Sequence, residues 1–457
     1  MNRNILSSNG YDFFEQGDSA QELADKTLSA FFGRKVEVSD LPINPYSIMV
    51  SAGAYYVLLD LDNVEGYFLP PTNEERFSKV ALRLKALPER RRFSAAHELC
   101  HHLKDTEMRI TKQGLNDSSE VFANKFATNL LMPDGVVNEV IEEIGLSQAE
   151  INLDKILSFS IKFAVSFQSA FIVLNNKLNW GLSNKDIAKE SKKYKPQKKR
   201  EKLVKDTDYL YGLYREIIEN YCFMKFKTPL KTRNDFLKFV VTNDHLIENG
   251  TVLKERISEI VSLLRVYTPS ELTSKYDFSD AEREVIGQYL MYDYIFNNTY
   301  TSDMKELKNL HKKFCSLAQF PEYGGHFRDT VAYIRGAEAA PTDPSLIDIE
   351  LIDLFNRNWM ELDDNIKTIK EVLLIHHGIT VIHPFNDGNG RTSRALLNYQ
   401  LISKDISPFF ISYEESAKNE YYEGLRICDK TRELQQLELY TYKNIIEMYS
   451  KMIKSTV

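Results

Sequence analysis

The chain has few of the features that mark secreted, membrane or nucleic-acid-binding proteins. Its 457 residues include only four cysteines, and none form a CxxC pair, which argues against a disulfide framework or a cysteine-rich zinc site. No uninterrupted apolar run approaches the roughly 20 residues that span a bilayer, and the first residues lack the apolar core of a signal peptide. Lys plus Arg number 58 against 65 Asp plus Glu, so the net charge of −7 provides no broad cationic surface for DNA or lipid. We therefore expect a cytoplasmic protein that partners with neither membranes nor nucleic acid.

The length and the ordinary composition, 43% hydrophobic and 27% charged, predict packed domains. Residues 43–68 are rich in Val, Ile, Leu and Tyr and predict short strands with turns, whereas helical spacing begins at Glu89 and dominates after Tyr209. The expected organisation is a mixed α/β domain at 1–184, a basic linker and helical connector at 185–242, and a helical domain at 243–457. No oligomeric state is predicted.

Ten Lys or Arg residues lie between Lys185 and Lys205, and Tyr194 is the one aromatic residue among them. Nucleic-acid surfaces interleave aromatic and basic residues, so this composition favours a linker or a solvated helix over a nucleic-acid site.

The first chemical motif is His97-Glu98-Leu-Cys-His101. Two histidines four apart in a helix project from one face, which suits two ligands of a tetrahedral Zn²⁺, and Glu98 is placed to act as general base on a metal-bound water. Glu120, in the first turn of the next amphipathic helix, is the candidate third ligand. His102 is a weaker candidate, because it points about 100° away from His101 around the helix.

The surrounding residues resemble the ImmA/IrrE family of zinc metallopeptidases over about residues 40–180. The matching positions are Arg92-Phe93, Ala96-His97-Glu98, His101, Glu120, Ala123-Asn124, Phe126-Ala127 and Leu130 to Pro133. The resemblance implies an α+β, zincin-like metallopeptidase domain. It also implies Zn²⁺ on His97, His101 and Glu120, Glu98 as general base, and a protein such as a repressor as the cleaved substrate.

The second motif, HPFNDGNGRTSR at residues 383–394, combines residues suited to phosphate chemistry. Gly388-Asn389-Gly390 lies where a new helix begins, so backbone N–H groups and the helix dipole can receive an anion. Arg391 and Arg394 are three apart and can reach the outer phosphates from one face of that helix. Asp387 offers hard oxygens to Mg²⁺, and His383 has a pKa suited to accepting a proton from a hydroxyl.

The motif matches the signature of the Fic family in full, and the resemblance extends over about residues 243–430. It includes Gly325 with Arg328, Tyr333 to Gly336, and His376. The resemblance implies a mostly α-helical domain that transfers AMP from ATP to a Ser, Thr or Tyr hydroxyl of a target protein. It assigns His383 as general base, Asp387 as Mg²⁺ ligand, residues 388–390 as anion hole, and both arginines as phosphate holders. Phe385 would anchor the loop, and residues 333–344 would pair with the target backbone.

Many Fic proteins also carry an inhibitory helix of the form Ser/Thr-x-x-x-Glu-Gly/Asn, whose Glu pairs with the second motif arginine. Here Glu248-Asn249 matches the end of that pattern, but Asp244 stands at the Ser/Thr position. A carboxylate there could repel Glu248 and loosen the pair. An ordinary surface helix with one glutamate is the alternative.

The resulting hypothesis is a multidomain protein that joins a zinc peptidase domain to a Fic adenylyltransferase domain. Two alternatives stay open. In one, the zinc domain only senses or recruits; in the other, the Fic site removes AMP or transfers another phosphate-containing group.

Overall fold

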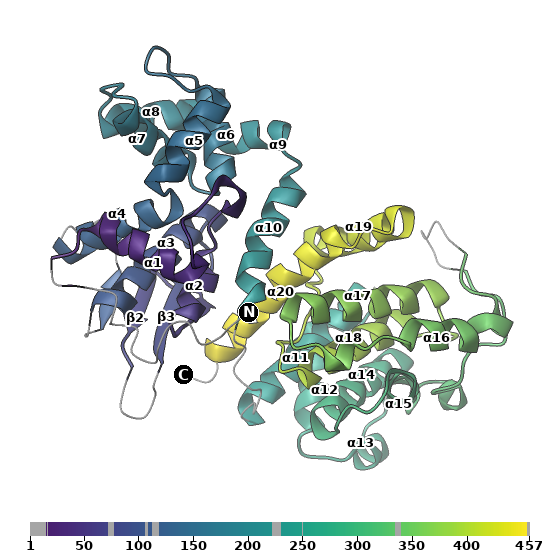
Figure 1. Cartoon of the computed structure of the whole chain (residues 1–457). Coiled ribbons are helices and arrows are strands. Elements are labelled where there is room, and N and C mark those ends of the chain that lie inside the picture. The colour runs from purple at the N-terminus through teal and green to yellow at the C-terminus, as the bar shows by residue number, and fades with distance from the viewer. Residues whose placement is uncertain are drawn as a thin grey trace. The chain divides into compact units, whose positions relative to one another are not determined.

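The computed structural model describes residues 15, 17–71, 77–105, 108–111, 118–221, 230–248, 250–333 and 340–454, without the side chains of 109–111, 230–232 and 453–454. These residues form two compact units, Met1–Cys222 and Phe223–Val457. Each unit has its own elements and its own core (Figure 1).

The first unit combines helices with one small sheet. Its elements in chain order are α1 (Ala20–Phe32), η1 (Val38–Asp40), α2 (Pro45–Ser51), β1 (Ala54–Leu59), β2 (Gly66–Leu69), β3 (Ser78–Arg83), α3 (Pro88–Lys104), β4 (Arg109–Thr111), α4 (Ser118–Leu131), α5 (Asp134–Ile144), α6 (Leu153–Phe163), α7 (Phe167–Lys177), α8 (Asn184–Tyr194), α9 (Pro196–Leu203) and α10 (Asp206–Glu219).

The sheet has the strand order β1-β3-β2-β4. β1 runs parallel to β3, with Ala54 opposite Ser78, whereas β2 is antiparallel to both β3 and β4. Burial alternates along β1, as expected for strands with one covered face. Helix α3 contacts β2 and β3 on one side and α2 and α4 on others. The helix that carries His97 and His101 is therefore packed at the centre of the unit.

Part of the predicted strand region is helical instead. Residues 45–51 form α2, because Asn44 caps its N-terminus by accepting hydrogen bonds from the backbone N–H groups of Tyr46 and Ser47. Pro45 occupies the first turn, where a missing N–H costs nothing. The prediction of strands from residue 43 was therefore wrong for this segment, and the first strand begins at Ala54.

The basic run takes the form of helices rather than an irregular linker. It covers most of α8 and α9, and Pro196 again stands in a first helical turn. Both helices, together with α10, fall in the first unit. Residues 222–229, within the predicted connector, lie outside the described residues.

The second unit is helical throughout its described residues. Its elements are α11 (Leu230–Ile247), α12 (Lys254–Leu263), α13 (Pro269–Lys275), α14 (Asp280–Asn297), α15 (Asp303–Cys315), η2 (Pro321–Tyr323), η3 (Pro344–Leu346), α16 (Ile347–Phe355), η4 (Trp359–Glu361), α17 (Asn365–Ile382), α18 (Asn389–Ser403), α19 (Glu415–Thr431) and α20 (Gln435–Lys454). A mixed first domain followed by a mostly helical second domain confirms the predicted fold class.

The centre of the second unit is the pair α17 and α18. Helix α17 contacts α16 and α20, and α18 contacts α14 and α15. The chain between α17 and α18 forms a short loop, residues 383–388, and both flanking helices pack against other helices of the unit (Figure 1).

Among the described helices, none is long and apolar enough on its own to cross a membrane. The pair α6 and α7 meets the length and composition criteria only together, with a bend of 111° between them.

Candidate functional site

In the first unit, the structure brings His97, His101 and Glu120 together. One ligand atom from each lies within 4.8 Å of the others, and all three residues are buried. His97 and His101 come from successive turns of α3, and Glu120 comes from the first turn of α4, which packs against α3. The trio is thus held by two packed helices.

The spacing within the trio suits a tetrahedral metal ion. The two Nε2 atoms lie 3.1 Å apart, His97 Nε2 lies 3.2 Å from Glu120 Oε2, and His101 Nε2 lies 3.4 Å from Glu120 Oε1. Ligands bonded to zinc at about 2.0–2.1 Å in a tetrahedron are separated by about 3.3 Å. The donor set and its separations therefore fit Zn²⁺ with one further coordination position.

Partners behind the two histidines orient their rings. His101 Nδ1 lies 2.6 Å from Asp105 Oδ2, and His97 Nδ1 lies 3.1 Å from Asn124 Oδ1. Such contacts place the proton on Nδ1 and leave the Nε2 lone pairs facing the centre. Burial raises the pKa of Asp105, but hydrogen bonds from His101 and Lys104 outweigh it and hold that pKa below its usual range.

His102 has a different role from its neighbour. Its Nδ1 lies 2.8 Å from Ser78 Oγ on β3, and its Nε2 lies 2.8 Å from the carbonyl oxygen of Ala52. Both ring nitrogens thus contact the sheet side of α3, away from the trio.

Glu98 is fully buried beside β2. A Cβ atom at Gly66 would collide with Glu98 Oε1, so the absence of a side chain at Gly66 makes room for this carboxylate. Its role as general base stays a prediction.

In the second unit, hydrogen bonds with Arg328 and Asn389 hold the loop 383–388 in place. Arg328 donates from Nε to the carbonyl oxygen of His383 at 2.7 Å, and its backbone N–H donates to Pro384 at 2.9 Å. Asn389 accepts from Phe385 N–H and donates to Phe385 C=O, both at 2.8 Å, so its side chain closes the loop. Phe385 itself is fully buried.

His311 on α15 is a support that sequence reasoning missed. Its ring stacks on Phe385 with centroids 3.7 Å apart, its Nε2 lies 3.0 Å from the Asp387 carbonyl oxygen, and its Nδ1 accepts from Gly325 N–H at 2.9 Å. Burial lowers the pKa of His311 to about 4, so the ring is neutral near pH 7 and Nε2–H donates to Asp387. The spacing of an isolated histidine 72 residues before the motif contains no signal of this contact.

Gly388 begins α18 in a conformation that requires glycine. Its φ is +76°, and a Cβ atom there would lie 2.6 Å from the ring of Phe314. The N-terminus of α18 therefore exposes its first backbone N–H groups on a tight turn that only glycine can make, the geometry in which helix N-termini accept anions.

His383 ends α17 with φ 54° and ψ 58°, a left-handed conformation that is uncommon for a residue with a side chain. Burial lowers the pKa of His383, although a hydrogen bond with the Thr380 backbone acts in the opposite direction. The imidazole is therefore neutral near pH 7 and able to accept a proton.

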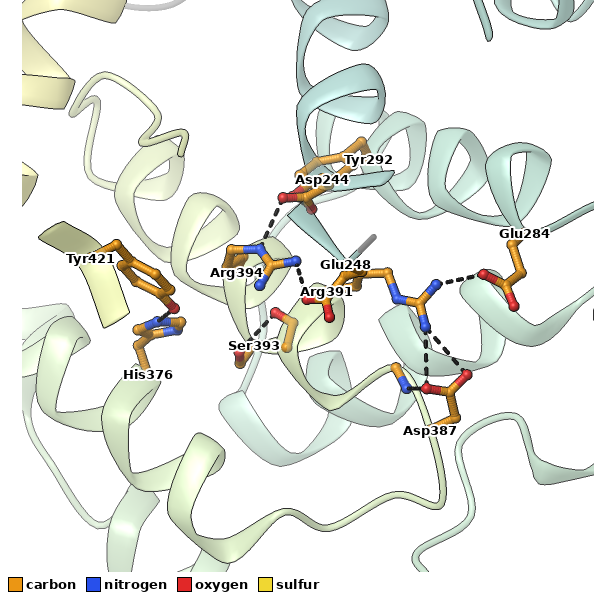
Figure 2. A network of polar contacts seen from close by, with 12 residues as sticks. Asp244, Glu248, Glu284, Tyr292, His376, Asp387, Arg391, Ser393, Arg394 and Tyr421 are labelled. Atoms are coloured by element: carbon orange, nitrogen blue, oxygen red, sulfur yellow. Dashed lines mark hydrogen bonds and ion pairs between the residues drawn. The ribbon is translucent and has the colours of Figure 1, made fainter. Parts of the chain in front are cut away.

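The two arginines of the motif are each held by two carboxylates (Figure 2). Arg391 contacts Glu284 on α14 at 2.7 Å and both Asp387 oxygens at 3.2 Å. Arg394 contacts Asp244 Oδ1 at 2.9 Å and Glu248 Oε1 at 2.8 Å. Glu248 also lies at the loop: its Oε1 would be 2.8 Å from a Cβ atom at Gly390.

Asp244 does not act only as a like charge beside Glu248, contrary to the expectation from the sequence. The two carboxylates accept from different nitrogens of the same guanidinium, so Arg394 offsets their repulsion. Asn249 and residues 334–339 of the expected flap lie outside the described residues.

His376 makes a further buried contact, because its Nε2 lies 2.7 Å from the Tyr421 hydroxyl (Figure 2). Burial lowers the pKa of His376 to about 3, so this ring is neutral and belongs to the core of the unit.

Comparison with known proteins identifies a family for each unit. Residues 301–401 match the Fic/DOC family, and residues 60–179 match the IrrE N-terminal-like domain. The chain thus contains a Fic/DOC domain and an IrrE N-terminal-like domain.

The similar curated proteins are each described as "Protein adenylyltransferase Fic". The protein of Drosophila ananassae is 31% identical over 158 residues, which is 33% of this chain and 30% of that protein. The protein of Drosophila grimshawi is 29% identical over 156 residues, 33% of this chain and 31% of that protein. The match therefore spans about a third of the length of these relatives.

Among solved structures, Fic-1 (residues 134–508) from C. elegans is 16% identical, with a TM-score of 0.40 over 72% of this chain and 88% of that chain. A Fic domain containing signaling protein from Bacteroides thetaiotaomicron is 15% identical, with a TM-score of 0.40 over 55% of this chain and 97% of that chain.

The geometry of the first unit predicts one zinc ion per chain. Glu120→Ala removes a member of the trio and should lower zinc content strongly, whereas His102→Ala should leave it close to that of the wild type, because His102 contacts Ser78 and Ala52. Elemental analysis of the purified proteins measures this. Equal metal loss in the two variants would show that Glu120 is not the third ligand.

Proposed function

We propose that the second unit transfers AMP from ATP to a hydroxyl of a target protein and that the first unit is a zinc-dependent peptidase. The observation that carries the first part is the loop 383–394. Within it, a neutral, half-buried histidine, a helix N-terminus preceded by glycine and two arginines lie on one short stretch of chain. The Fic/DOC match over residues 301–401 supports the same activity.

Each step of the transfer can be assigned to groups of this chain. His383 takes the proton of the acceptor hydroxyl, and the hydroxyl oxygen forms a bond to the α-phosphorus while the bond to pyrophosphate breaks. The first N–H groups of α18 and the two arginines hold the phosphates in place. Positioning and charge neutralisation supply most of the rate in such reactions, which suits a site made of dipoles and fixed cations.

Asp387 is the residue that would hold Mg²⁺. Its carboxylate is 75% exposed, accepts from Gly388 N–H, and contacts Arg391. A bound Mg²⁺ would neutralise charge on the phosphate oxygens. A hard oxygen donor at the edge of the phosphate loop fits that ion.

The contact between Glu248 and Arg394 supports a built-in brake. Glu248 carries its negative charge next to Gly390, where a phosphate would approach the loop, and it uses the Nη2 group that an outer phosphate would need. Burial raises the pKa of Glu248, but the charge and hydrogen bond of Arg394 outweigh it and hold that pKa below its usual range. The pair is therefore lost only as the pH falls through this lowered pKa, and the brake stays charged near pH 7.

For the first unit, the trio with Glu98 supports zinc-dependent peptide hydrolysis. His97, His101 and Glu120 would hold the ion, which when bound would lower the pKa of a water molecule. Glu98 lies on α3 with His97 and His101 and is buried beside Gly66 of β2. It would then receive the proton and pass it to the leaving amine.

The transferase is tested by His383→Ala. AMP transfer should fall about 10²-fold or more while nucleotide still binds, because the variant lacks the group that accepts the proton. Incubation with ATP labelled in the adenine and, separately, in the γ-phosphate identifies the transferred group. For the wild type, kcat/KM should fall on the acid side with a midpoint below the ordinary histidine value of about 6.5, since burial lowers the pKa of His383. Label from the γ-phosphate on the target would contradict adenylyl transfer.

The brake is tested by Glu248→Gly. AMP transfer, including transfer onto the protein itself, should rise at least tenfold, because removal of about 1.4 kcal/mol of misalignment corresponds to that factor. Glu255→Gln, in the first turn of α12, is a matched control for the loss of one negative charge nearby in the chain. Equal activity of wild type and Glu248→Gly would show that residues 243–250 are only a connecting segment.

The peptidase is tested by Glu98→Gln. This variant should keep its zinc, because Glu98 is not one of the trio, and lose cleavage of peptide libraries or host proteins by about 10² or more. Cleavage by neither the zinc-loaded wild type nor the variant would favour a sensing or recruiting role for this unit.

A further inference from the structure

We propose that Asp244 is a positioning residue that anchors Arg394 independently of Glu248, so that Arg394 stays oriented toward the phosphate loop when the brake is released. This inference rests on the proposed function of the loop 383–394. It assigns Asp244 a role opposite to that of Glu248, although both carboxylates contact the same arginine.

The two carboxylates bind different parts of the guanidinium. Asp244 accepts from Nε, the nitrogen nearest the side-chain stem, whereas Glu248 accepts from Nη2 at the outer end (Figure 2). Arg394 Nη1 would lie 3.0 Å from a Cβ atom at Gly390, so the outer end faces the phosphate loop. A phosphate can therefore replace Glu248 without disturbing the bond to Asp244.

Burial separates the roles of the two acids. The side chains of Arg394 and Asp244 are 3% and 4% exposed, whereas that of Glu248 is 33% exposed. A buried cation without a counter-charge is strongly unfavourable, so Arg394 must keep a buried anion when Glu248 moves away. Asp244 is that anion among the described residues that contact the guanidinium through an ion pair.

Asp244 is itself fixed in place. It lies inside α11, one turn before Glu248, which follows the last residue of that helix. The hydroxyl of Tyr292 on α14 donates to Asp244 Oδ2 at 2.6 Å, and Tyr292 is fully buried. This contact directs Oδ1 toward Arg394, so the anchor extends from α14 through Asp244 to α18.

Arg391, the other arginine of the motif, also pairs with a carboxylate on a neighbouring helix, but that carboxylate is more exposed than Asp244. Glu284 on α14 contacts Arg391 Nη1 at 2.7 Å, but the Glu284 side chain is 35% exposed. Removal of Glu284 would leave Arg391 with Asp387 as its counter-charge. Removal of Asp244 from a chain that also lacks the Glu248 contact would leave Arg394 with no ion-pair partner among the described residues. The structure thus predicts a larger effect at Asp244 than at Glu284.

Two roles for Asp244 give opposite results. If Asp244 were a second inhibitory carboxylate, Asp244→Ala in the otherwise native chain would raise AMP transfer, as Glu248→Gly does. If Asp244 anchors Arg394, Asp244→Ala does not release the site, and it damages a site that has already been released.

The experiment uses the full chain with Glu248→Gly as the released background. Asp244→Ala in that background should weaken binding of α,β-methylene ATP at least tenfold and lower kcat/KM for AMP transfer by a similar factor. Asp244→Asn should restore only part of the binding, because its Oδ1 still accepts from Nε but carries no negative charge. Asp235→Ala, an exposed acid on the same helix, is the matched control and should bind like the background.

Several outcomes would overturn the proposal: higher AMP transfer in Asp244→Ala without the Glu248 substitution, or unchanged nucleotide affinity in the double variant. If Asp244→Ala does not fold, Tyr292→Phe in the released background decides. Weaker nucleotide binding supports the anchor, and unchanged binding contradicts it. The affinity measurement needs no transfer, so a background that binds nucleotide without modifying protein would refute the proposed function while still testing the anchor.

Discussion

A buried positive charge must always face a negative one, and this constraint organises the second unit. Arg394 is buried among α11, α14 and α18, where an unpaired guanidinium would be strongly unfavourable. Carboxylates supply the counter-charge, and nucleotide phosphates carry the same sign. The site is therefore already arranged for an anion. Binding exchanges one anion for another, so little reorganisation is needed during the reaction. Arg391 is likewise paired with two carboxylates, those of Asp387 and Glu284.

In the first unit, the packing of helices holds three metal-binding side chains together. His97, His101 and Glu120 place donor atoms 3.1 to 3.4 Å apart in a buried position. Asp105 and Asn124 hold the rings from behind. The packing of α3 against the sheet and α4 thus determines the site, and the sheet itself contributes Gly66, whose small size admits Glu98.

The parts of both sites that could be predicted from the sequence are local in the chain. The loop 383–394 contains its own turn, helix start and cations, and His97 with His101 needs only helical periodicity. Contacts from distant elements could not be predicted: Asp244, Tyr292, Glu284 and His311 reach the motif through tertiary packing that no spacing encodes. From the sequence, Asp244 was visible only as a carboxylate that could repel Glu248, because a sequence places charges on a helix without showing the cation that both of them contact. In the same way, the strand-like composition of residues 45–51 concealed a helix that Asn44 begins.

The residues of the two sites do not overlap. His97, Glu98, His101 and Glu120 belong to the first unit, whereas Asp244, Glu248, His383, Asp387, Arg391 and Arg394 belong to the second. Helix α11, the first described helix of the second unit, supplies both carboxylates that contact Arg394. Asp244 lies within it, and Glu248 directly follows its last residue. A shift of α11 along its axis by one residue, about 1.5 Å, would move Asp244 and Glu248 together and change both contacts at once. Both contacts of Arg394 therefore depend on the position of one helix, although the roles proposed for the two carboxylates are opposite.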